Sequence, residues 1–179
     1  KDASEEERSI TEINTGTYVF NNKALFEALD KVGNENAQGE YYLPDVISIM
    51  KEAGEIVKAF TMDNFDDAIG VNDRVALAEA TRLMTKRINE NHMRNGVTFV
   101  NATSTYIEAD VEIGQDTVIE SGVSLKGNTK IGSHAFIGSN SEIISSNIAD
   151  HVEIRQSVLE YSEVEEKVTV GPFAHLRAK

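Results

Sequence analysis

A group of polar residues opens a stretch that otherwise has the composition of a β-strand. Glu12, Asn14, Thr15 and Gly16 occupy the first half of EINTGTYVF, residues 12–20, and the second half is mostly apolar and aromatic. A strand that only packs has no use for a carboxylate and an amide at its start, whereas a strand that ends at a ligand cleft does. From the spacing alone, Asn14 is either a ligand-binding amide or the amide of a turn at the strand end.

Two further clusters carry groups that can coordinate metals. Asp63, Asp66 and Asp67 lie together in MDNFDD, but they fit no ligand spacing, and a solvated loop is the alternative. His134 and His151 occupy equivalent positions of a repeat described below, which predicts that their imidazoles stack on successive layers. A metal site and a solvated histidine pair both remain open there, although no third ligand is apparent.

The elements that must position the first of these groups alternate along residues 10–72. A strand is expected over 10–20, a helix over 22–32, a second helix from Pro44 to Gly54, and a strand over 55–60. The order strand, helix, helix, strand is a piece of an α/β layer rather than a complete one.

A long helix is expected over residues 73–94, with Asn72 or Asp73 as its N-cap and Asn95-Gly96 at its end. At a rise of about 1.5 Å per residue such a helix spans about 30 Å. Because it stands between two regions of unlike pattern, we interpret it as a connector.

Residues 97–179 contain an internal repeat. Aliphatic residues recur every six positions, with three steps shortened to five, and each is preceded two positions earlier by Ser, Thr, Ala or Val. The aliphatic series is Ile107, Ile113, Ile119, Leu125, Ile131, Ile137, Ile143, Ile148, Ile154, Leu159, Val164, Val170 and Leu176. Same-face pairs at this period indicate short strands separated by tight corners, three to a triangular coil. The pattern therefore predicts a left-handed parallel β-helix with these aliphatic side chains inside.

Composition excludes several classes of function. The formal net charge of −13 argues against nucleic acid as a partner, because the phosphate backbone would be repelled. No apolar run approaches the roughly 20 residues of a membrane span, so no membrane association is expected. Cysteine is absent, which fits a reducing compartment and removes thiolate catalysis and disulfides.

Four segments in this order carry a resemblance to a known family: EINTG, NAQGEYYLPD, GVNDR and GPFAHLR. Together with the hexads, they resemble the bacterial bifunctional N-acetylglucosamine-1-phosphate uridyltransferase and glucosamine-1-phosphate N-acetyltransferase. The resemblance implies the C-terminal part of a Rossmann-like nucleotidyltransferase domain over residues 1–74. It implies a linker helix over 75–95 and the N-terminal part of a β-helix acetyltransferase domain over 96–179.

The family's activity sets the remaining expectations. It transfers uridylyl from UTP to N-acetylglucosamine 1-phosphate with Mg²⁺, and acetyl from acetyl-CoA to glucosamine 1-phosphate. The resemblance therefore implies a cytoplasmic enzyme that makes UDP-N-acetylglucosamine for peptidoglycan and other envelope polymers. It also implies a homotrimer formed through the β-helix.

Individual residues inherit roles only through this resemblance. Asn14 resembles the residue that hydrogen-bonds the sugar of UDP-N-acetylglucosamine, and Asn72 resembles a Mg²⁺ ligand that also touches the nucleotide sugar. Arg177 resembles the arginine that grips the sugar phosphate in acetyl transfer. Tyr42 and Glu40 are candidates for the sugar pocket, with packing as the alternative. The alternative for Asn72 is a helix cap, and the alternative for Arg177 is a surface arginine without a ligand.

The family's catalytic groups are not in this sequence. Its glycine-rich phosphate loop and its acetyl-transfer His, Lys, Tyr and Asn residues have no counterparts among the 179 residues, so we expect a central piece that is inactive in both reactions. Two alternatives stay open. One is a related hexose-1-phosphate nucleotidyltransferase with a structural β-helix, and the other is a trimerisation scaffold without catalysis.

Overall fold

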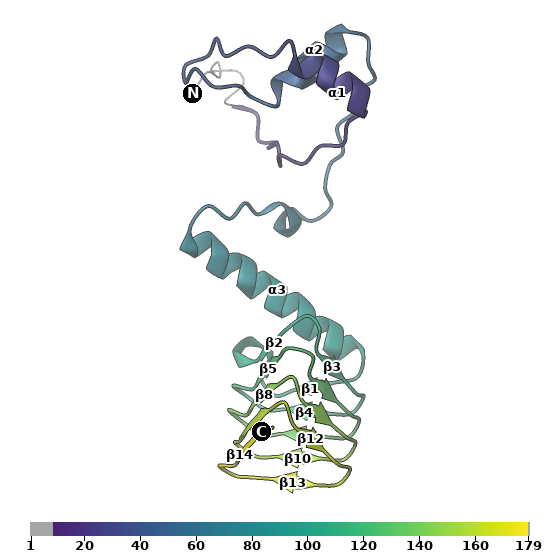
Figure 1. Cartoon of the computed structure of the whole chain (residues 1–179), viewed down its shortest axis with the longest axis vertical. Coiled ribbons are helices and arrows are strands. Elements are labelled where there is room, and N and C mark those ends of the chain that lie inside the picture. Colours follow the sequence, from purple (N-terminus) through teal and green to yellow (C-terminus); the bar gives the residue numbers. More distant parts are fainter. Residues whose placement is uncertain (1–8, 179) are drawn as a thin grey trace. The chain divides into compact units, whose positions relative to one another are not determined.

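The computed structural model describes residues 9–178. The chain divides into two compact units, and their boundary in the sequence lies between Ala68 and Ile69. The first unit contains α1 (Asn22–Leu29), α2 (Asp45–Glu52) and the short 3₁₀ helix η2 (Phe65–Ala68) (Figure 1). The second unit contains α3 (Arg74–Arg94), the 3₁₀ helix η3 (Ala102–Ser104) and all the β-structure in the described part of the chain.

The two helices of the first unit pack against each other through a small core. Ala28 of α1 and Val46 and Met50 of α2 are buried in it. The Asn21 side chain caps α1 by accepting a hydrogen bond from the Ala24 amide at 3.2 Å. Past the end of α2, Gly54 adopts a left-handed φ of 86°, a conformation that glycine adopts without steric cost.

Three predictions for the first unit are wrong. Helix α1 ends at Leu29 and not at residue 32, because residues 30–32 form turns, and the strands expected over 10–20 and 55–60 do not form. A strand needs a partner for its backbone groups, and no other strand lies in residues 9–68 to supply one. Several apolar side chains of those segments are consequently left in solvent, with Val19 98% and Phe60 89% exposed, whereas Phe20 packs against the core of the first unit.

The long helix expected over residues 73–94 is confirmed as α3. Of the two cap candidates, Asp73 is the N-cap, and its carboxylate accepts a hydrogen bond from the Ala76 amide at 2.7 Å. Asn72 lies one residue before this N-cap and is exposed. The capping role is thus taken by Asp73, and the Asn72 side chain remains available for another role.

The C-terminal part of α3 is joined to the first coil of the β-structure by a buried amide. Asn89 is 1% exposed, and its Nδ2 donates to the carbonyl oxygens of Ala102, at 2.9 Å, and of Thr105, at 3.1 Å. His92, one turn further along α3, is also buried. A helix of largely polar composition is therefore held against the first coil of the β-structure by a few specific groups.

The buried imidazole makes the stability of the second unit depend on pH. Burial lowers the pKa of His92 below its ordinary value near 6.5, since the charged form loses its hydration. The folded state then binds fewer protons than the unfolded state below that pH, so stability is complete above about pH 6.5 and falls on acidification. We expect thermal melts between pH 8 and pH 5 to show a larger loss for the parent than for His92→Gln. Equal losses would contradict this role of His92.

The β-structure is a stack of three-strand coils. Its strands form three parallel sheets in the orders β1-β4-β7-β10-β13, β14-β11-β8-β5-β2 and β12-β9-β6-β3. Their bounds are β1 Thr98–Phe99, β2 Tyr106–Ile107, β3 Glu112–Ile113, β4 Val118–Ile119, β5 Ser124–Lys126, β6 Lys130–Ile131, β7 Phe136–Ile137, β8 Glu142–Ile144, β9 Asn147–Ile148, β10 Glu153–Ile154, β11 Val158–Glu160, β12 Glu163–Val164, β13 Thr169–Val170 and β14 His175–Arg177. Each strand pairs with the strand one coil away, as a β-helix requires.

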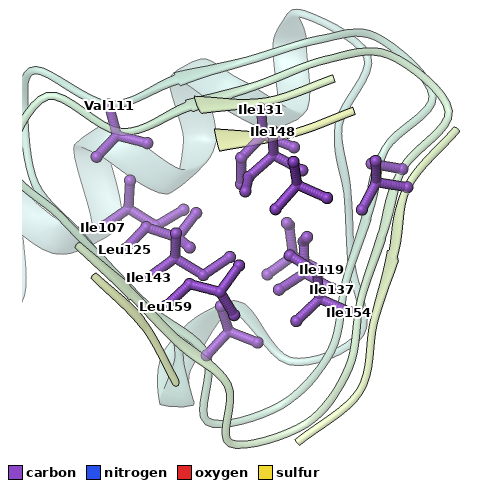
Figure 2. Packing of buried hydrophobic residues seen from close by; sticks show 14 of the residues in the cluster. Ile107, Val111, Ile119, Leu125, Ile131, Ile137, Ile143, Ile148, Ile154 and Leu159 are labelled. Atoms are coloured by element: carbon purple, nitrogen blue, oxygen red, sulfur yellow. The ribbon is translucent and has the colours of Figure 1, made fainter. Parts of the chain in front are cut away.

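The predicted aliphatic residues form columns inside the coils. Figure 2 shows one column at each wall of the triangle, through Leu125, Ile137 and Ile148, and all three side chains are at most 1% exposed. Two members of the series depart from the prediction, since Ile113 is only half-buried and Leu176 is 38% exposed. Leu176 pairs in register with the buried Leu159, and β14 is the end strand of its sheet among the described residues.

The spacing of the coils leaves no room for a side chain at some corners. A Cβ added to Gly114 would lie 2.5 Å from backbone atoms of Gly132 and Ser133 on the next coil, a contact that forces the coils apart. We expect Gly114→Ala to destabilise the second unit by about 1–3 kcal/mol in thermal or denaturant unfolding. Gly33→Ala, whose Cβ would meet no atom within 4 Å, is the matched control and should change stability little. Equal melting temperatures for the two variants would contradict the coil spacing.

Candidate functional site

Asn14 organises a turn in the first unit. Its Oδ1 accepts a hydrogen bond from the Gly16 amide at 2.9 Å, and its Nδ2 donates to the hydroxyl of Tyr18. Gly16 has a φ of 74°, which allows the chain to reverse there. The structure thus contains the turn that was the alternative for Asn14, and its sugar contact stays a prediction.

Glu40 and Tyr42 lie in a loop that is ordered by another amide. The Oδ1 atom of Asn36 accepts hydrogen bonds from the amides of Gln38, at 3.1 Å, and Glu40, at 3.2 Å. The Tyr42 hydroxyl donates to Oε1 of Gln38, while the Glu40 side chain is exposed. The loop therefore fixes the backbone beside both candidates, and their place in a sugar pocket stays a prediction.

Asn72 is the one candidate for Mg²⁺ coordination. Its amide oxygen suits a hard cation, but a Mg²⁺ site uses several oxygen ligands, usually including carboxylates. No group of three or more His, Asp or Glu residues within 9–178 could hold a metal ion, and Asp63, Asp66 and Asp67 are exposed. The described residues of this chain do not by themselves fit Mg²⁺.

Arg177 lies in the last strand of its sheet and points out of the coil. Leu176 lies on the inward face, since it pairs with the buried Leu159 of β11, so the side chains of His175 and Arg177 project to the opposite face. Arg177 is exposed, and its register partner across the strand pair is Glu160. A forked guanidinium in this position presents donors to a ligand with two acceptor oxygens, such as a phosphate.

The neighbours of Arg177 include a pair that the sequence did not reveal. Nε2 of His175 lies 3.0 Å from Oε2 of Glu160, and the two side chains are 53% and 35% exposed. Because a carboxylate can only accept, the imidazole donates this hydrogen bond. The position of His175, two residues before Arg177 on a strand, was the available signal that both side chains share one face.

The same outward face carries a second diagonal ion pair closer to α3. Lys126 of β5 lies 2.5 Å from Oε1 of Glu142 on β8, and this hydrogen bond is the main cause that raises the pKa of Lys126. Here too the carboxylate contacts the residue diagonal to its register partner, since Glu142 pairs with Ser124. Diagonal pairs of this kind are within reach of long side chains on neighbouring strands.

The histidine stack is confirmed. The rings of His134 and His151 lie 5.0 Å apart between centroids and 6° from parallel, and both residues have a φ near 60° at equivalent corners. Asp116, one coil before, is 3.9 Å from Nδ1 of His134. Among the described residues, the stack is not part of any group of three or more His, Asp or Glu residues that could hold a metal ion.

The five candidate residues do not form one site within either unit. Asn14, Glu40 and Tyr42 belong to the first unit. Asn72 and Arg177 both belong to the second, but Asn72 precedes the 21-residue α3 and Arg177 lies in the last strand, β14. The five residues, if each has its expected role, would therefore belong to at least two separate sites.

Comparison with known proteins identifies the class first. Residues 105–145 match the family described as bacterial transferase hexapeptide (six repeats). The β-structure of the second unit is therefore a left-handed parallel β-helix of hexapeptide repeats, as predicted. A solved structure of serine acetyltransferase from Neisseria gonorrhoeae, in complex with serine, matches 83% of this chain and 79% of its own at 16% identity and a TM-score of 0.41, a similarity too low to bear on function.

Individual relatives match the whole chain. Over 177 residues, or 99% of its length, the chain is 61% identical to the bifunctional protein GlmU of Listeria innocua and 62% identical to that of an Exiguobacterium species. It is 56% identical over 179 residues to the bifunctional protein GlmU of Enterococcus faecalis. The resemblance stated from the four sequence segments is confirmed, and the chain spans 39% of the length of these relatives.

No helix within residues 9–178 is both long and apolar enough to cross a membrane. Helix α3 has sufficient length at 21 residues, but its sequence RVALAEATRLMTKRINENHMR is rich in charged and polar residues.

Proposed function

We propose that this chain is part of a bifunctional enzyme of UDP-N-acetylglucosamine synthesis. The observation that carries the proposal is the identity of about 60% to bifunctional GlmU proteins, which extends over both units and not over the hexads alone. The first unit would belong to the uridyltransferase domain, α3 would be the linker, and the β-helix would begin the acetyltransferase domain. The complete protein would act in the cytoplasm, as a homotrimer formed through the β-helix.

In the uridylyl transfer, the residues of this chain would bind and orient the sugar nucleotide. Asn14 would hydrogen-bond the sugar, because an amide offers a donor and an acceptor to hydroxyl and acetamido groups. Glu40 and Tyr42 would line the sugar pocket, and Asn72 would contribute one oxygen to Mg²⁺ beside the nucleotide. Bound Mg²⁺ supplies neutralisation of phosphate charge, and its other ligands would come from residues outside this chain.

In the acetyl transfer, Arg177 would hold the phosphate of glucosamine 1-phosphate. Two parallel N–H donors of a guanidinium match two phosphate oxygens, which fixes the sugar in one orientation. The groups that transfer the acetyl from acetyl-CoA would lie in segments that this sequence does not contain. The 179-residue chain would therefore be inactive in both reactions when produced alone.

The mass of the protein in its source organism tests whether this chain is a piece of the bifunctional enzyme. Since 177 residues make up 39% of the relatives and this chain has a mass of 19.7 kDa, we expect an intact protein of about 50 kDa. Mass spectrometry of the protein captured with an antibody against the β-helix would measure it. A mature species of about 20 kDa with no larger form would contradict the proposal.

A further inference from the structure

We propose that His175 is a positioning residue that keeps the Glu160 carboxylate away from Arg177. Its imidazole would thereby leave the guanidinium open to the phosphate of the ligand. The inference rests on the proposed function, in which Arg177 binds that phosphate. It assigns roles to two residues, His175 and Glu160, for which neither the resemblance nor the comparisons supply one.

The register of the last two strands of this sheet creates the need for such a residue. Glu160 of β11 and Arg177 of β14 are direct partners in the parallel pair, and both side chains lie on the outward face. Neighbouring strands are about 4.8 Å apart, so opposite charges at directly paired positions are in reach of one another. Without a competitor, the carboxylate of Glu160 and the guanidinium of Arg177 are the natural partners.

The structure shows that Glu160 is paired elsewhere. Its Oε2 accepts the hydrogen bond from Nε2 of His175 at 3.0 Å, which draws the carboxylate toward the start of β14. Within residues 9–178, no carboxylate lies within ion-pair distance of Arg177. Among the described residues, Arg177 therefore makes no ion pair, although a carboxylate is its direct register partner.

An ion pair between Glu160 and Arg177 would oppose phosphate binding in two ways. A carboxylate and a phosphate compete for the same fork of guanidinium donors, so the pair would have to open before the ligand binds. A carboxylate beside the bound phosphate would also repel it. The hydrogen bond from His175 removes the competition by giving Glu160 another donor.

The experiment measures acetyl transfer by the complete bifunctional protein, with glucosamine 1-phosphate as the varied substrate. We expect His175→Ala to raise the KM for glucosamine 1-phosphate about fivefold with kcat near that of the parent, because exposed ion pairs compete weakly. His175→Gln keeps an N–H donor for Glu160 and should leave KM near the parent value. An unchanged KM in His175→Ala would overturn the inference.

A double-mutant cycle separates positioning from a simple loss of positive charge. In the background of Glu160→Gln there is no carboxylate to hold back, so adding His175→Ala should leave KM unchanged. If His175 attracted phosphate directly, the double variant would keep the raised KM, and the inference would be overturned. Arg177→Ala separates this failure from that of the proposed function: if Arg177→Ala leaves KM unchanged, the phosphate assignment itself is wrong. Melting temperatures of all variants check that each is folded.

Discussion

Replacing Ile131 with aspartate is expected to lower the melting temperature of the second unit by more than about 10 °C, since a loss of about 4 kcal/mol or more shifts a domain of this size by that amount. Ile131 is 4% exposed and lies between Ile113 and Ile148 in the column formed by β3, β6 and β9. The substitution removes apolar packing and places a carboxylate in the apolar core of the β-helix.

A matched substitution on β9, the strand paired with β6, controls for the added charge. Asn147 is the outward-facing register partner of Lys130 and is exposed, so Asn147→Asp introduces the same carboxylate in solvent. Its melting temperature should stay within about 2 °C of the parent, because surface substitutions usually change stability by less than about 0.5 kcal/mol. If Ile131→Asp melted as close to the parent as this control, the inward register of the hexads would be wrong.

Replacing Asn72 with alanine in the complete bifunctional protein is expected to lower uridylyl transfer about 100-fold or more, while acetyl transfer stays near normal. The proposal gives Asn72 an oxygen ligand to Mg²⁺ at the nucleotide, and loss of a group that supports a metal site typically costs one to several factors of ten. Acetyl transfer would be unaffected because the proposal assigns it to a separate site on the β-helix. Both activities and the melting temperature would be measured on one preparation.

The neighbouring residue supplies the control. Asp73 is the observed N-cap of α3, so Asp73→Ala should cost about 0.5–2 kcal/mol of stability. In an assay at low temperature, where the variant remains folded, it should leave uridylyl transfer nearly intact. The two substitutions are thus expected to have different effects: Asn72→Ala lowers uridylyl transfer, and Asp73→Ala lowers stability. If Asn72→Ala leaves uridylyl transfer unchanged, the assignment of Asn72 to Mg²⁺ fails.

The β-helix could be predicted from the sequence because its period is local. Each hexad places one aliphatic side chain inside and one tight corner after it, so the positions of Leu125, Ile137 and Ile148 follow from counting along the chain. The exceptions are positions whose burial depends on neighbouring coils, which the six-residue period does not describe. Leu176 is partly exposed in β14, the end strand of its sheet among the described residues, and the six-residue period alone does not show that.

The first unit could be predicted only in part because strands depend on partners. The helices around Ala28 and Val46 pack against each other, α1 is also capped by the Asn21 side chain, and both helices were expected. The segments containing Val19 and Phe60 have strand composition, but strand pairing within a sheet is a long-range property that residues 9–68 do not supply.

Parts of the candidate site lay beyond sequence reasoning for the same reason. Sequence spacing placed His134 over His151 because equivalent corner positions repeat along the chain. The pair of Glu160 and His175 joins diagonal positions on two coils, fifteen residues apart, and depends on which way one carboxylate turns. Such a choice is decided by competing donors in three dimensions and not by the repeat.

The most direct test of the proposed function is an assay of both reactions on the purified complete protein that contains this chain. With UTP, N-acetylglucosamine 1-phosphate and Mg²⁺ it should form UDP-N-acetylglucosamine and pyrophosphate, and with acetyl-CoA it should acetylate glucosamine 1-phosphate. Nucleotidyl transfer without any acetyl transfer would contradict the account and identify a hexose-1-phosphate nucleotidyltransferase with a structural β-helix. The absence of both activities in a folded trimer would contradict it as well, and would leave a scaffold.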